Sequence, residues 1–230
     1  MAENLILTGP DGTEYTFPGV SKVSIRKSGG GRAEYGSGGV GGIYEQVFNR
    51  TVGNVTASDL DGLTAIEQYA FAGCRSMRSI EIPSTVSDIM CYAFAACGLY
   101  SITIPSTVSY VGLDSTFLEQ GRVFRNCESL ETVVFGNTVV IFGDYCFEGC
   151  TALRAVVLPA TNGRYYGLFK GCTRLSSIRI TATTPPDRVD SDTFNGVPTS
   201  CAIYVPAASV NAYKSASIWS ARASHIYPLT

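Results

Sequence analysis

The sequence predicts a β-rich α/β fold, a solenoid of stacked repeats whose strands form one parallel sheet. Three observations predict it. A Phe followed three residues later by Cys recurs along the chain, the recurrences are evenly spaced, and a short β-favouring run follows each of them. Repetition at a period of about 20–50 residues is typical of solenoids and propellers. The repeats therefore decide the architecture.

The Phe–Cys anchor occurs in five copies, and a sixth copy has Val in place of Cys. Successive Phe residues are 23, 30, 23, 22 and 25 positions apart. A unit this short cannot bury its own apolar residues, so each unit must stack on its neighbours. We expect the Phe and Cys side chains to form ladders inside the coil. The six copies are Phe71/Cys74, Phe94/Cys97, Phe124/Cys127, Phe147/Cys150, Phe169/Cys172 and Phe194/Val197.

Each unit supplies one strand in which apolar positions alternate, as Ile80 and Ile82 do. Several strands end at Pro, where the missing N–H does little harm. The predicted strand runs are 77–83, 99–105, 130–135, 153–159, 175–180 and 203–206, and the prolines that end them are Pro83, Pro105, Pro159 and Pro206.

The residue before the anchor Cys is typical of a turn with positive φ. Gly adopts this conformation freely and Asn tolerates it. Ala96 is the exception, and we expect the next glycine, Gly98, to form the turn in that repeat. The residues that fit the pattern are Gly73, Asn126, Gly149, Gly171 and Gly196.

The first 61 residues do not match the repeat and are predicted to be a cap or attachment segment. Residues 5–7 and 15–17 read as a hairpin around the turn 10–12, and the Gly-rich tract 28–42 is typical of a flexible segment. Residues 47–55 fit a degenerate first repeat, since a solenoid must cover the exposed end of its core.

The repeats are predicted to span residues 62–200, and residues 201–230 are predicted to form a terminal strand and a C-terminal cap. Residues 210–224 read as one short amphipathic helix that directs Tyr213 and Trp219 inward. The longest spacing, between Phe94 and Phe124, implies about seven inserted residues near 113–121. Such an insertion is either a binding loop or a tolerated surface bulge.

Composition excludes several classes of function. A hydrophobic content of 45% with 16% charged residues is that of a globular protein. The net charge of −2 provides no basic field, so we expect no nucleic-acid binding. No apolar run reaches the roughly 18 residues that span a bilayer, so we expect no membrane insertion. Residues 1–10 lack the pattern of a secretory leader.

The eight cysteines indicate packing rather than a metal site, because five recur at the repeat spacing and not at ligand spacing. Neighbouring rungs would bring Cys74 and Cys97 to about 5 Å, within reach of a disulfide. Cys91, Cys146 and Cys201 lie off the ladder and have no nearby His in the sequence. We therefore expect no metal.

No catalytic or cofactor-binding residue is predicted. Residues 36–41 match the letters of a dinucleotide-binding loop, but no strand and helix flank them as that motif requires. The single histidine, His225, lies in the terminal segment with no nucleophile arrangement around it. The prediction is a protein without enzymatic activity.

Two phrases, IEIPSTVSDIMCYAFAAC and ITIPSTVSYV, resemble the BspA-like branch of the leucine-rich repeats found in many bacteria. The ending with TATTPP, DTFNGVP and IYVPAASVNAYKSASIWSARASHI is similar to the terminal segment of that family in gut bacteria. The resemblance covers residues 63–227. It implies a right-handed leucine-rich-repeat solenoid, and a protein that mediates interactions at the cell surface or after secretion.

Alternation within each strand leaves one set of side chains on the outer face of the sheet. This face is small and neutral, with Val134 and Val157 forming an apolar spot on adjacent rungs; the alternative is an ordinary β-surface. The candidate binding residues are Ser79, Glu81, Ser101, Thr103, Thr132, Val134, Ala155, Val157, Ser177, Arg179 and Tyr204.

The primary hypothesis is a monomeric binding or adhesion module whose partner is a protein or a glycan. The alternative is a cytoplasmic or phage-associated structural scaffold, for which residues 1–61 would be the attachment segment.

Overall fold

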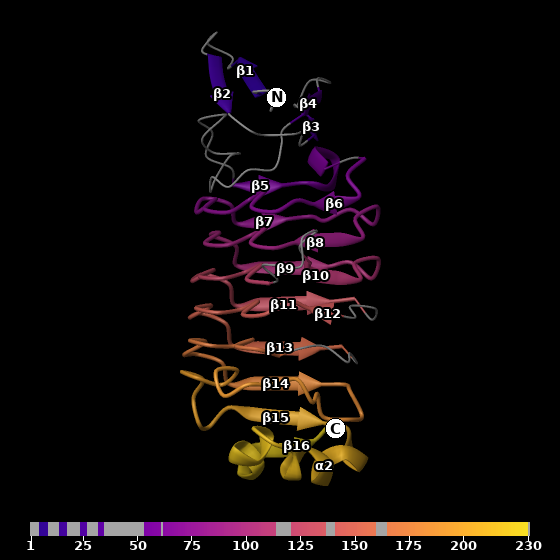
Figure 1. Ribbon diagram of the computed structural model, residues 1–230, viewed down its shortest axis with the longest axis vertical. Helices are drawn as coiled ribbons and strands as arrows, with labels where there is room; N and C mark the ends of the chain where they lie inside the picture. Colours follow the sequence, from indigo (N-terminus) through magenta and orange to yellow (C-terminus); the bar gives the residue numbers. More distant parts are fainter. Residues whose placement is uncertain are drawn as a thin grey trace.

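The chain is a stack of short strands that run across its long axis, as the computed structural model shows (Figure 1). The structure describes residues 5–8, 14–17, 24–26, 32–34, 53–60, 62–113, 121–136, 141–159 and 165–229. The predicted insertion at 113–121 lies almost entirely outside these residues, as does most of the Gly-rich tract.

The larger sheet has six parallel strands in the order β16-β15-β14-β13-β11-β9. Successive repeats pair in simple register, for example Thr132 with Ser101 on one side and with Ala155 on the other. A bridge between Glu81 and Thr103 continues the sheet to the preceding repeat. The strands are β9 (Ser101–Ile104), β11 (Thr132–Phe135), β13 (Ala155–Leu158), β14 (Ser177–Ile180), β15 (Ala202–Val205) and β16 (Ile226–Pro228).

A second parallel sheet, which the sequence did not predict, lies in the return segments of four successive repeats. Its order is β12-β10-β8-β6. Each of its strands buries an apolar residue against the core, as Ile89 and Val111 do. These strands are too short to show a clear alternation in the sequence. They are β6 (Ala65–Ile66), β8 (Asp88–Met90), β10 (Tyr110–Leu113) and β12 (Ile141–Phe142).

The predicted Phe ladder fills the interior between the two sheets. Phe124 is fully buried, with its ring centroid 5.5 Å from that of Phe94 and 5.4 Å from that of Phe147. The stack extends to Phe71 at one end and to Phe169 at the other. Aromatic stacking of this kind adds to the gain from burying the rings.

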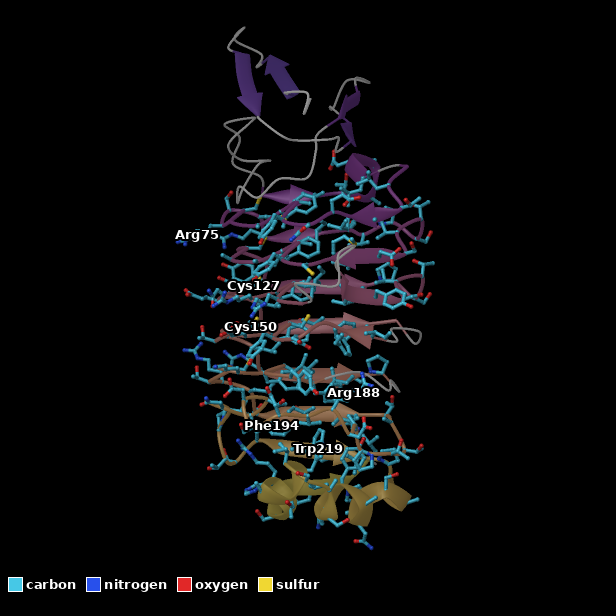
Figure 2. The ribbon with its side chains drawn as sticks, in the orientation of Figure 1. Arg75, Cys127, Cys150, Arg188, Phe194 and Trp219 are labelled. Atoms are coloured by element: carbon cyan, nitrogen blue, oxygen red, sulfur yellow. The ribbon has the colours of Figure 1, made fainter. Side chains whose placement is uncertain are left out.

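The anchor cysteines form a second ladder beside the rings. From Cys97 to Cys172, each anchor thiol donates a hydrogen bond to the carbonyl of the Phe in the preceding repeat, as Cys127 does to Phe94 at 2.9 Å and Cys150 does to Phe124 at 3.0 Å. Figure 2 shows Cys127 and Cys150 one above the other. All eight cysteines are free thiols, so a small side chain with one weak donor satisfies a buried carbonyl here.

The buried thiols lead to a prediction about reactivity. Burial raises the pKa of Cys127 and of Cys172 to about 12, well above the usual value for a thiol. Because only the thiolate is nucleophilic, we expect a water-soluble disulfide reagent at pH 8 to leave the ladder cysteines unmodified in the native protein. All eight thiols should react after unfolding in guanidinium. Rapid labelling of the native ladder would contradict the packing described.

The turn before each anchor Cys has positive φ, as predicted, but the exception was assigned wrongly. Ala96 itself takes the left-handed conformation, with φ of 56°. Gly98 is needed for another reason, because a Cβ at that position would lie 1.9 Å from the carbonyl oxygen of Arg75. The backbone of the turn is therefore kept even where the residue is unfavourable for it.

The C-terminal segment covers the last repeat, but it is not the single helix that was predicted. It contains a 3-10 turn η2 (Ala207–Ser209), the short helix α2 (Val210–Ser215) and the 3-10 helix η3 (Trp219–His225). The break occurs where Ala216 is extended and Ile218 has positive φ. Tyr213 and Trp219 are buried as predicted, and Trp219 packs edge-on against Phe194 (Figure 2).

The N-terminal region contains two antiparallel strand pairs. β1 (Leu5–Thr8) pairs with β2 (Glu14–Phe17), which confirms the strands of the predicted hairpin, while its turn lies outside the described residues. β3 (Ser24–Arg26) pairs with β4 (Arg32–Glu34), and β4 alone lies within the Gly-rich tract 28–42 that was predicted to be flexible.

Of the degenerate first repeat predicted at residues 47–55, the structure describes only residues 53–55, and these contain the first stacked strand. β5 (Asn54–Val55) pairs in parallel with β7 (Ser79–Ile80). The 3-10 turn η1 (Ala57–Leu60) follows β5 and buries Leu60.

Candidate interaction surface

The outer face of the six-stranded sheet carries two rows of side chains that follow the long axis. In the first row the residues are small, and in the second they become larger toward the C-terminal end. All eleven candidate residues lie in these rows, either exposed or half-buried. The first row contains Ser79, Ser101, Thr132, Ala155 and Ser177, and the second contains Glu81, Thr103, Val134, Val157, Arg179 and Tyr204.

The apolar spot predicted on adjacent rungs lies on the surface, with both valines about half exposed. Val134 is 56% exposed and Val157 is 49% exposed, so these side chains contribute little to the core. Their neighbours in the first row, Thr132 and Ala155, are too small to screen them. A flat partner surface can therefore reach both valines.

Beyond Val157 the second row becomes cationic and aromatic. Arg179 pairs in register with Val157 and with Tyr204, and its guanidinium lies 5.4 Å from the centroid of the Tyr204 ring. The Tyr204 ring lies 5.9 Å from that of Tyr227 in β16. We call Val134, Val157, Arg179, Tyr204 and Tyr227 the sheet stripe.

Sequence reasoning missed Tyr227. It belongs to a strand that follows the C-terminal helices, where no Phe–Cys anchor marks a repeat. A signal was nevertheless present, because Tyr227 follows Tyr204 by 23 residues, which is a repeat spacing of this chain. Tyr227 is 41% exposed and extends the stripe to the last strand of the sheet.

At the start of the strands lies a border of larger side chains. Tyr100 is 52% exposed and carries the guanidinium of Arg78 5.1 Å from its ring centroid. Two rungs further, Arg154 pairs with Glu131 at 3.7 Å, and both side chains are at least half exposed. Charges paired in this way at an exposed site add little stability.

A different aromatic row, also missed, lies on the turn side of the coil. Tyr69 and Tyr92 stack at 4.8 Å, and Arg122 lies between the rings of Tyr92 and Tyr145. The sequence signal is a Tyr two residues before an anchor Phe. In this row the ring faces contact one another or the guanidinium of Arg122, so they are less accessible to a ligand than the sheet stripe.

Two cations on the turn side form ion pairs within the protein. Lys170 contacts Asp192 at 2.6 Å, and this ion pair raises the pKa of Lys170 and lowers that of Asp192. Arg125 pairs with Glu148 at 2.9 Å. The turn side is therefore less suited than the sheet stripe to binding a charged partner.

The described residues contain neither a candidate metal site nor a candidate membrane-spanning helix. In that part of the chain no group of three or more metal-ligating side chains comes together. His225 contacts Ser224 at 2.9 Å, a local contact in the last turn of η3. Nor does the described part contain a helix of the length and hydropathy needed to cross a bilayer.

Comparison with known families agrees with the repeat architecture. A model described as the BspA type leucine-rich repeat region matches residues 41–121 and 119–220, in six copies. The chain belongs to the BspA-type leucine-rich repeat family. Members of repeat families present binding surfaces built from adjacent units, so this membership supports an interaction or surface module.

Two solved structures show weak overall similarity. One is a leucine-rich cell surface protein from Faecalibacterium prausnitzii, with 18% identity and a TM-score of 0.36; the match covers 76% of this chain and 59% of that one. The other is a leucine-rich repeat protein from Bacteroides ovatus, with 17% identity and a TM-score of 0.37; it covers 100% of this chain and 76% of that one. No curated protein matches the chain.

Proposed function

We propose that this leucine-rich-repeat protein is a non-catalytic binding module that presents the sheet stripe to a protein or glycan partner, and that it acts in adhesion. The observation that carries the proposal is the continuous row in which exposed Val134 and Val157 lead into Arg179, Tyr204 and Tyr227. Aromatic residues and Arg are enriched at the centres of protein interfaces.

The rigidity of the surface supports binding. Each residue of the sheet stripe lies on a strand that is hydrogen-bonded to a neighbouring strand on both sides. The exception is Tyr227, which lies on the edge strand β16. Little conformational entropy is therefore lost when a partner contacts the face. Both valines already lie at the surface, so binding recovers the free energy of removing their apolar area from water.

The binding site is tested by charging the apolar spot. A Val134→Asp/Val157→Asp double variant should lose at least about tenfold in affinity for any glycan or matrix protein that an immobilised array shows the wild type to bind, because two carboxylates would be desolvated. Ile141→Asp is the matched control, since Ile141 is 38% exposed on the other sheet. Equal loss in both variants, or no loss in the double variant, contradicts the proposed site.

The proposed location is the cell surface or the exterior of the cell, as the resemblance to BspA-like proteins implies. Protease treatment of intact source cells, with fractionation alongside, tests this proposal. Cleavage from outside is the expected result. Protection in the cytosol, or co-purification with phage particles, would favour a structural scaffold instead.

A further inference from the structure

Arg179 is the cation of the sheet stripe, where its guanidinium lies against the ring of Tyr204. Within the described parts of the chain, no acidic side chain forms an ion pair with it. Its partners in register are Val157 and Tyr204, and neither carries a charge. By contrast, three other cations are paired: Arg125 with Glu148, Arg154 with Glu131 and Lys170 with Asp192.

The Tyr204 ring supports the guanidinium of Arg179. The carbon of the guanidinium lies 5.4 Å from the ring centroid, a distance typical of a cation–π contact. Such a contact covers a face of the planar group and leaves its in-plane N–H donors able to form two parallel hydrogen bonds with one carboxylate. The ring of Tyr227, whose centroid lies 5.9 Å from that of Tyr204, extends this aromatic surface.

Apolar side chains flank this cation on the other side. Val157 is the next residue of the row, and Val134 follows on the next rung, both about half exposed. A ligand that matches the stripe places a carboxylate opposite Arg179 and apolar groups on either side of it. One unpaired cation fits a single carboxylate better than it fits a polyanion, which needs many cations in a row.

We propose that the sheet stripe binds an acidic–apolar protein segment. Arg179 forms an ion pair with an Asp or Glu carboxylate of that segment, and Val134, Val157 and Tyr227 contact the apolar residues beside the carboxylate. This inference rests on the proposed function, because it specifies the partner of the same surface. Arg179 is then the residue that determines specificity, while the valines and tyrosines supply apolar contact.

The probe is a displayed library of random peptides, selected on the full-length protein. Wild type should enrich peptides with Asp or Glu next to aromatic or aliphatic residues. Arg179→Glu should lower the affinity of an individual selected acidic peptide at least about tenfold and shift a fresh selection toward Lys and Arg. Binding to wild type should also weaken as salt is raised, because the pair is partly exposed.

The control is Arg174→Glu, which makes the same charge change at an exposed Arg outside the sheet stripe and should leave the selection unchanged. Both variants should unfold at the wild-type denaturant midpoint. If wild type enriches no peptides, or if the acidic preference survives Arg179→Glu, the inference is overturned.

Failure of the inference is distinguishable from failure of the proposed site. If the Val134→Asp/Val157→Asp variant loses the peptides while Arg179→Glu keeps their acidic preference, only the carboxylate assignment fails. If that double variant binds the peptides as wild type does, the peptides do not occupy the stripe, and both proposals fail.

Discussion

Phe124→Ala should lower the free energy of unfolding by about 3–5 kcal/mol, the range found when a buried aromatic residue is truncated. Phe124 is fully buried, and its ring stacks between those of Phe94 and Phe147 with interplanar angles of 3° and 2°. Removing the ring leaves a cavity between two repeats. Because a repeat is stabilised by its nearest neighbours, the interfaces on both sides weaken together.

Guanidinium-induced unfolding, followed by circular dichroism, measures this loss. Tyr100→Ala serves as the control because Tyr100 is an aromatic side chain that is 52% exposed, and its loss should cost well under half as much. Similar midpoints for the two variants would show that Phe124 is not part of a continuous internal ladder.

Gly121→Ala should be comparably damaging, with a loss of about 3–5 kcal/mol, near the upper end for single substitutions. Gly121 has φ of 106°, a conformation that an L residue rarely adopts. A Cβ on it would lie 1.8 Å from the carbonyl oxygen of Asp144, and the backbone of Gly112 and Gly143 closes in on either side. Backbone atoms cannot move aside as a flexible side chain can.

Gly53→Ala is the matched control, because a Cβ at Gly53 would meet no atom within 4 Å. That variant should unfold at the wild-type midpoint or slightly above it, since Ala restricts the unfolded chain more than Gly does. A mild effect of Gly121→Ala, equal to that of Gly53→Ala, would contradict the close approach of backbones at this turn.

The internal ladders could be predicted from the sequence because their residues recur. Phe124 and Cys127 are recognisable only when they are aligned with the same pair in the other repeats, and the fixed spacing then places them on one line inside the coil. The strands ending at Pro105 and Pro159 were predictable for the same reason, since a Pro follows an alternating run in each case.

Features without a recurring letter were not predictable in the same way. The second sheet uses short strands such as Ile141–Phe142, whose few residues carry no clear alternation. The helix predicted over 210–224 breaks because Ile218 adopts a positive φ, which an isoleucine rarely does and which the sequence therefore does not predict. Ala96 takes a glycine-like conformation because the adjacent repeats impose it, which propensity alone does not reveal.

The candidate surface was predictable in part. Alternation placed Val134, Val157 and Arg179 on the outer face, and the structure has them there. Alternation does not predict the contact between Arg179 and Tyr204, nor that Tyr227 belongs to the sheet stripe. Both depend on the register between neighbouring strands.

The sheet stripe is tested most directly as a binding surface by finding which tyrosines a bound partner covers. Nitration of exposed tyrosines, read by mass spectrometry, should be compared for the free protein and for the protein bound to the array component that retains it. Nitration of Tyr204 and Tyr227 should fall in the complex, while that of Tyr69 and Tyr92 on the turn side should stay unchanged. Protection of Tyr69 and Tyr92, with Tyr204 and Tyr227 reacting as in the free protein, would contradict this prediction.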